Sequence, residues 1–174
     1  MGNPSSAQWG ISYDMASESN KVVIRRFIQL LNGANGIRAT EIISPSALFR
    51  IPGEPEARLG PNGCLAIIDI LRSGFPDIQW TLHDMIGEDD KVAVRVTMRG
   101  THRASFLHVP ATGKTILVQS IGFYRLTGGK LLEEYVQPDL SALLQRITPT
   151  RRYGRSSAPT RLGLAALKEF AILS

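Results

Sequence analysis

The sequence predicts an α+β fold in which a curved antiparallel sheet wraps around N-terminal helices. Apolar residues recur with helical spacing in the first half of the chain. After Pro76 the apolar period shortens to two, which is typical of strands. Helices therefore come first and strands follow in a run, a segregated order that favours α+β over alternating βαβ folds. Such a sheet, curved around the helices, would enclose a pocket.

The 174 residues are divided into three segments by composition and periodicity. Residues 1–17 contain Gly, Asn, Pro and Ser, show little periodicity and are expected to form a flexible leader. Residues 18–147 carry the periodic patterns of one folded domain. Residues 148–174 form a basic tail, rich in Arg, Ser and Pro, with a C-terminal apolar stretch that can form a short helix.

The helices are predicted from apolar spacing and from the residues that end them. The first begins at Ser19, a helix-capping residue, and ends at Asn32 and Gly33. A short helical stretch at 39–43 then leads into a strand at 47–51. The third helix opens at Gly60 and closes at Gly74.

Four consecutive strands follow, because apolar and polar residues alternate between turn sequences. They are expected at residues 78–83, 91–102, 115–126 and 131–137. The sequence Thr-Gly-Gly-Lys at 127–130 is typical of a hairpin turn. Asp139 then begins a short final helix.

Composition and charge exclude several classes of function. No apolar run approaches the roughly 20 residues of a membrane helix, and the single cysteine, Cys64, excludes an internal disulfide. A reducing, cytoplasmic setting is expected.

The net charge is +5, but the tail has five basic residues and one acidic, which leaves +1 for the body. The body thus lacks the basic face of a nucleic-acid binder. No phosphate loop, GxGxxG or GxSxG motif is present, so no cofactor is expected.

Four segments resemble the SnoaL-like polyketide cyclases, in matching order and spacing. They are residues 20–31, 60–80, 91–115 and 123–145. The resemblance implies the cone-shaped α+β barrel of the nuclear-transport-factor-2-like superfamily, which is usually a homodimer. Its members close rings on polyketides, open epoxides, isomerise ketosteroids, dehydrate small substrates or only bind ligands, so the fold alone does not fix the function.

The sequence departs from the family at positions where chemistry usually occurs. The family commonly has His-Trp-Asp near the end of the last strand, where this chain has Glu134, Tyr135 and Val136. A His or Asp is common in the preceding strand, where this chain has Gly122. The related limonene epoxide hydrolases pair an Arg with an Asp two residues later, whereas here Arg95 is followed by Thr97.

Four polar residues are predicted to carry the chemistry. Glu134 and His102 are expected to be the proton-transfer pair, because a buried carboxyl has a raised pKa and an imidazole titrates near neutrality. Arg95 is expected to anchor a substrate oxygen, and Asp139 is a reserve acid. Structural alternatives remain open: an Arg95–Glu134 ion pair or an exposed face for Arg95, a strand-end His102 bound to a loop carbonyl, and Asp139 as a helix cap.

Three aromatic residues, Trp80, Tyr124 and Tyr135, are predicted to line the pocket, although aromatic strand residues are more often core. A metal site made of His83, His102 and His108 is not favoured, because the three lack tight spacing.

These features predict a cofactor-independent cyclase or isomerase of secondary metabolism. It would act by acid–base catalysis on a small apolar oxygenated substrate, namely a polyketide, prenylated phenol or epoxide. The alternatives are a non-catalytic ligand-binding module and an epoxide hydrolase. We expect a homodimer that contacts neither nucleic acid nor membrane.

Overall fold

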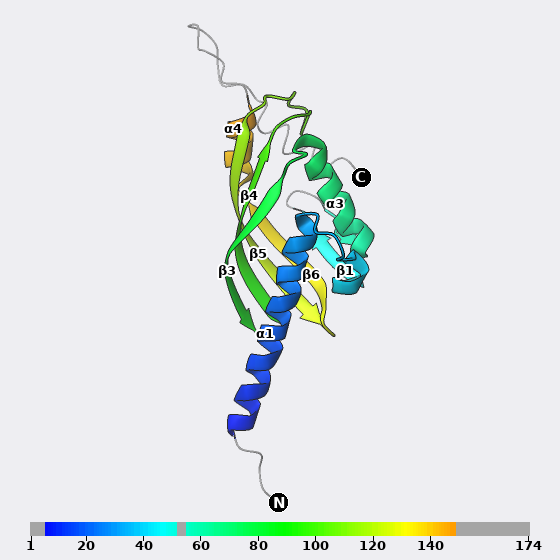
Figure 1. Cartoon of the computed structure of the whole chain (residues 1–174), viewed down its shortest axis with the longest axis vertical. Coiled ribbons are helices and arrows are strands. Elements are labelled where there is room, and N and C mark those ends of the chain that lie inside the picture. Colours follow the sequence, from blue (N-terminus) through cyan, green and yellow to red (C-terminus); the bar gives the residue numbers. More distant parts are fainter. Residues whose placement is uncertain (1–5, 52–54, 149–174) are drawn as a thin grey trace, which may run out of the picture.

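The computed structural model describes residues 6–51 and 55–148, and it is an α+β domain (Figure 1). Ten elements follow one another in the predicted order, with one additional short strand. They are α1 (Ser6–Leu31), α2 (Ala39–Ile42), β1 (Ile43–Arg50), β2 (Arg58–Leu59), α3 (Gly60–Gly74), β3 (Gln79–Glu88), β4 (Lys91–Thr101), β5 (Thr115–Thr127), β6 (Lys130–Pro138) and α4 (Leu140–Ile147).

The strands form one curved, unclosed sheet in the order β2-β1-β6-β5-β4-β3 (Figure 1). Strands β3 to β6 are an antiparallel meander, as predicted. The pairing of β1 with β6 is parallel, so the expectation of a wholly antiparallel sheet was wrong at this one place. The long connection from β1 to β6, through α3 and four strands, permits this arrangement. Helix α1 packs on β3 and β4, whereas α3 packs on β1.

Alternation of burial along β5 distinguishes the two faces of the sheet. On β5, every second residue from Ile116 to Leu126 is buried, while the residues between them are mostly exposed. The buried set faces the helices and forms the core with Ile24 and Phe27 of α1. We call the helix-covered side the inner face and the other the outer face. This alternation fixes which side chains can reach an enclosed site.

Helix α1 begins at Ser6, so the predicted start at Ser19 was wrong and residues from Ser6 onward are helical. Packing explains the difference at Ser17, which is buried against β3: a Cβ on Gly87 would lie 2.6 Å from its Oγ. Tertiary contacts of this kind stabilise helical turns that have a weak local pattern. Residues 1–5 and the tail beyond Thr148 lie outside the described residues.

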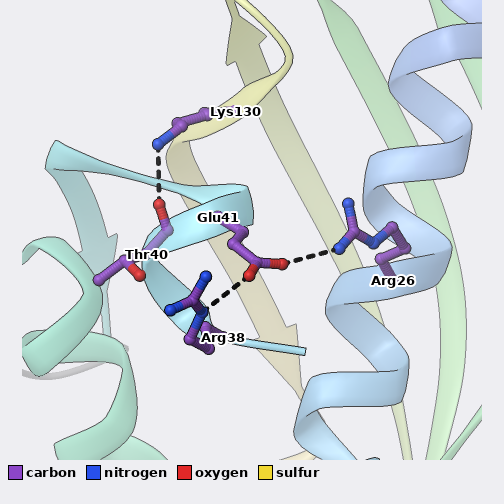
Figure 2. A network of polar contacts seen from close by, with 5 residues as sticks. All are labelled: Arg26, Arg38, Thr40, Glu41 and Lys130. Atoms are coloured by element: carbon purple, nitrogen blue, oxygen red, sulfur yellow. Dashed lines mark hydrogen bonds and ion pairs between the residues drawn. The ribbon is translucent and has the colours of Figure 1, made fainter. Parts of the chain in front are cut away.

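Helix α2 is tied to its neighbours by a polar network (Figure 2). The Glu41 carboxylate accepts hydrogen bonds from Arg26 of α1 at 3.1 Å and from Arg38 at 2.8 Å. The Lys130 ammonium, at the start of β6, donates to the Thr40 carbonyl at 2.7 Å. The network thus holds α1, α2 and the β5–β6 hairpin together at one end of the domain.

Candidate active site

Three inward-facing residues lie side by side on adjacent strands. Glu134 of β6 pairs with Phe49 of β1 on one side and with Tyr124 of β5 on the other. Phe49 and Tyr124 are buried, and Glu134 is partly buried. The fold therefore places one carboxyl group between two aromatic side chains on the inner face.

Two helices cover this row. The ring of Phe27, from α1, lies 5.8 Å from the Tyr124 ring in an edge-on arrangement and 6.4 Å from the Phe49 ring. Cys64, from α3, is buried close enough to Glu134 for the carboxylate charge to act on it. Burial first, and then Glu134, raise the pKa of the Cys64 thiol, so the thiol stays protonated at neutral pH.

Burial raises the pKa of Glu134 to about 7, and a hydrogen bond from Tyr124 opposes that rise. The pKa of Tyr124 is itself raised, first by burial and then by the Glu134 charge. The phenol therefore keeps its proton and donates a hydrogen bond to the carboxylate. Since both forms of Glu134 are populated near pH 7, this side chain can either accept or donate a proton.

His102 lies at the other end of the domain. Tyr124 pairs with Val92 near the start of β4, whereas His102 follows the last residue of that strand, Thr101. This separation corresponds to about 30 Å along the strand. The structure therefore does not bring Glu134 and His102 together as a proton-transfer pair.

The surroundings of His102 are those of a core residue. Its side chain is 0% exposed, its Nδ1 lies 3.0 Å from the Thr112 hydroxyl, and its ring packs on Phe75 at 5.2 Å. Within the described residues, its Nε2 has no hydrogen-bond partner. Burial lowers the pKa of His102, which favours the neutral imidazole.

Arg95 is on the outer face, so the exposed-face alternative is correct and the alternative of a pair with Glu134 is wrong. Its Nε donates to the Asp84 carboxylate of β3 at 2.6 Å, and the side chain is exposed. The residues that share its face, Thr97 and Arg99, are also directed away from the helices, since Val94 and Val96 take the buried positions. Arg95 thus cannot contact a substrate held beside Glu134.

The remaining predicted residues make contacts within the fold. Exposed Asp139 caps α4, accepting a hydrogen bond from the Ala142 amide at 2.9 Å. Trp80 is in the core, and its amide and carbonyl bind the Asn32 side chain at 2.7 and 2.9 Å. Tyr135 is on the outer face, where its hydroxyl accepts from Arg50 at 3.0 Å. Of the three aromatic residues predicted to line the pocket, only Tyr124 lies beside Glu134.

Sequence reasoning missed Cys64 and Phe27 as part of the site. Cys64 lies four residues before Ile68, which is also buried, so the helical period of α3 contains the signal that both face inward.

Among the described residues, no three or more His, Cys, Asp or Glu side chains gather as a metal site would require. His83 is on the outer face, bonded to Thr97 at 2.7 Å, far from sealed His102. In the same residues, no helix has both the length and the apolar character needed to cross a bilayer.

Comparison with known proteins gives the family. The sequence model of the SnoaL-like polyketide cyclase family matches residues 21–147. The chain belongs to this family. A search of the curated proteins gave no match.

Several solved structures share the fold. A protein from Jannaschia sp. CCS1 described as a SnoaL-like polyketide cyclase has 22% identity and a TM-score of 0.67; the match covers 84% of this chain and 97% of that one. IdmH from Streptomyces antibioticus, described as a polyketide cyclase, has 26% identity and a TM-score of 0.66, with 73% and 96% covered. TsrD from Streptomyces laurentii has 23% identity and a TM-score of 0.65, with 75% and 95% covered. Family and neighbours together support a cyclase or isomerase role.

Proposed function

We propose that this protein is a cofactor-independent cyclase or isomerase in which Glu134 is the acid–base catalyst. The observation that carries the proposal is the Glu134 carboxyl, with a pKa of about 7, held against the Tyr124 phenol on the inner face. In its ionised form Glu134 removes a proton from the substrate, and in its neutral form it returns that proton at another atom. The reaction then needs no external acid, base or cofactor.

The surroundings of Glu134 support a small, apolar, oxygenated substrate. Phe27 and Phe49 supply apolar walls, and a carboxylate in such walls is a stronger base than in water. The Tyr124 hydroxyl is the polar group beside it. A polyketide, prenylated phenol or epoxide combines an apolar skeleton with oxygens that such groups can bind. The description of IdmH as a polyketide cyclase, at 26% identity, favours the polyketide.

Turnover of a panel of these three substrate classes, followed by mass spectrometry, tests the proposal. Once a substrate is found, Glu134→Gln should lower kcat by about 10²–10⁴-fold, because it removes the proton-transfer group and keeps the shape. Glu133→Gln is the matched control, since Glu133 is the adjacent carboxylate and forms an ion pair with Arg125 at 2.7 Å. Equal kcat in the two variants would remove Glu134 from the mechanism.

The alternatives give different results in the same panel. A ligand-binding module would show affinity without turnover by the wild-type protein. An epoxide hydrolase would incorporate oxygen from labelled water into a diol, whereas a cyclase or isomerase incorporates none.

We further propose that the protein is a homodimer joined through the outer face of the sheet. Large apolar side chains are exposed there: Ile121 at 63%, Tyr135 at 48% and Phe123 at 46%. They border an open hollow with a volume of about 410 Å³. An apolar surface of this kind is typical of protein–protein contacts. A second copy suits it because the adjacent Arg95 and Asp84 supply both charges to a two-fold contact.

Sedimentation velocity of the full chain tests the dimer. A dimer mass is expected for the wild type, and Ile121→Glu should convert it to a monomer by burying an unpaired charge. Val22→Glu is the control, because Val22 is also exposed but lies on α1. A monomeric wild type, or a dimer that survives Ile121→Glu, would refute this interface.

A further inference from the structure

Gly122 lies directly beneath the Tyr124 ring. It occupies an inward position on β5, paired with Val94 of β4 and Val136 of β6. A Cβ added at Gly122 would meet the Tyr124 Cε2 at 2.7 Å, its hydroxyl at 2.8 Å and its Cζ at 3.0 Å. The ring therefore leans along the strand and fills the space that a side chain at position 122 would take.

The backbone does not require a glycine at this position. Gly122 is in the middle of a regular strand and its φ is not in the left-handed region. Glycine weakens a strand interior, where it often marks a close approach by another group. The approaching group here is the Tyr124 ring, which is also packed by the edge of Phe27 at 5.8 Å.

We propose that Gly122 is a positioning residue: the missing side chain leaves the space in which the Tyr124 phenol is held against the Glu134 carboxyl. The contact distances at Gly122 and the pairing of Tyr124 with Glu134 carry this inference. It deepens the proposed function, because the phenol would set the protonation of the catalytic carboxyl. A larger residue at position 122 would displace the phenol and leave Glu134 without its hydrogen bond.

Among the described residues, the titratable groups that face Glu134 come from two elements, β5 and α3. Tyr124 is the first and Cys64 is the second. Phe49 of β1 and Phe27 of α1 supply no charge. Arg125 and Glu133 pair with one another and, by strand alternation, face outward. A substitution at Gly122 would therefore change the pKa of Glu134 through loss of the Tyr124 hydrogen bond.

The test is a ¹³C NMR titration of the Glu134 side-chain carboxyl in the full chain without substrate. Tyr124→Phe should raise the pKa of Glu134 by about one pH unit, because a hydrogen bond to the charged form is lost. Gly122→Ala should produce a similar rise although Tyr124 is retained. The double variant should show no further rise, since both changes remove the same hydrogen bond. Ser120→Ala, on the same face of β5, should leave the pKa unchanged.

Two results would overturn the proposal: an unchanged pKa of Glu134 in Gly122→Ala, or additive rises in the double variant. If Gly122→Ala alone does not fold, the same substitution is made in a Tyr124→Leu background, where the ring is absent. Folding there is expected, and failure to fold there refutes a clash with Tyr124. The titration needs no substrate, so an absence of turnover would refute the proposed function and leave this inference standing.

Discussion

Glu134 and His102 are both titratable residues in the interior of the domain, yet their surroundings differ. Burial acts on both and favours the neutral form, raising the pKa of Glu134 and lowering that of His102. Glu134 remains partly exposed and has the Tyr124 phenol beside it. His102 is 0% exposed and is held through its backbone, with its amide donating to Lys114 and its carbonyl accepting from Gly113, both at 2.9 Å.

A pKa shift caused by burial does not by itself identify a catalytic group. The same physical cause acts at both ends of the sheet. Chemistry also requires that a substrate can reach the group and that a partner orients it. Glu134 is partly exposed and has the Tyr124 phenol beside it, whereas His102 has the Thr112 hydroxyl as a partner but is fully buried against Phe75.

The largest expected effect on the stability of the fold comes from removing the His102 ring. His102→Ala should lower the free energy of unfolding by about 2–4 kcal/mol, because it leaves a cavity against Phe75. Turnover per folded molecule should stay within about two-fold of the wild type, since His102 is far from Glu134. Urea denaturation measures the free energy of unfolding, and kinetics corrected for the folded fraction measure the turnover per folded molecule. His83→Ala, on the exposed outer face, is the control. A loss of kcat with unchanged stability would show that His102 acts in catalysis and not as a core residue.

The pH dependence of stability should separate the two residues in sign. The folded-state pKa of Glu134 is raised from 4.5 to about 7, so the folded state binds more protons than the unfolded state between these values. Stability should therefore fall by up to about 3 kcal/mol as the pH rises from 4.5 through 7. Glu134→Gln should flatten this decline, which denaturation at a series of pH values measures.

His102 should give the opposite dependence of stability on pH in the same experiment. Its pKa is lowered from 6.5, so the unfolded state binds its proton first and stability should fall as the pH drops below 6.5. His102→Ala should remove only this acid-side loss, and Glu134→Gln only the loss at higher pH. If either variant altered the other residue's slope, the two ends of the domain would be coupled.

The order of elements could be predicted from the sequence because periodicity and turn residues are local signals. The strand meander, its hairpin at Thr127–Lys130 and the capping of α4 by Asp139 all follow from short stretches of sequence. The parallel pairing of β1 with β6 and the early start of α1 could not be predicted. Both depend on contacts between segments distant in the chain, such as Ser17 against β3.

The candidate site was predicted in part for the same reason. Strand alternation correctly gave Arg95, Thr97 and Arg99 one shared face, but it could not say whether that face is inner or outer. Glu134 and Tyr124 were both predicted, whereas the Cys64 and Phe27 side chains above them come from helices whose packing the sequence does not specify. In the sequence, Gly122 is only a departure from the family, because its contact with Tyr124 depends on how the ring leans along the folded strand.

Arg95→Ala should have the smallest effect and therefore sharpens the contrast between buried and exposed charge. Its ion pair with Asp84 is short, at 2.6 Å, but solvent reaches both side chains. Because water screens such a pair, its loss should change the free energy of unfolding by less than about 1 kcal/mol. The pKa of Glu134 should not move, since Arg95 is on the opposite face of the sheet. Denaturation and the NMR titration of Glu134 check these outcomes, with Asp84→Asn expected to match. A shifted Glu134 titration in Arg95→Ala would show that the outer-face charge acts through the sheet on the candidate site, and the enclosed pair of Glu134 and Tyr124 would then not be an independent unit.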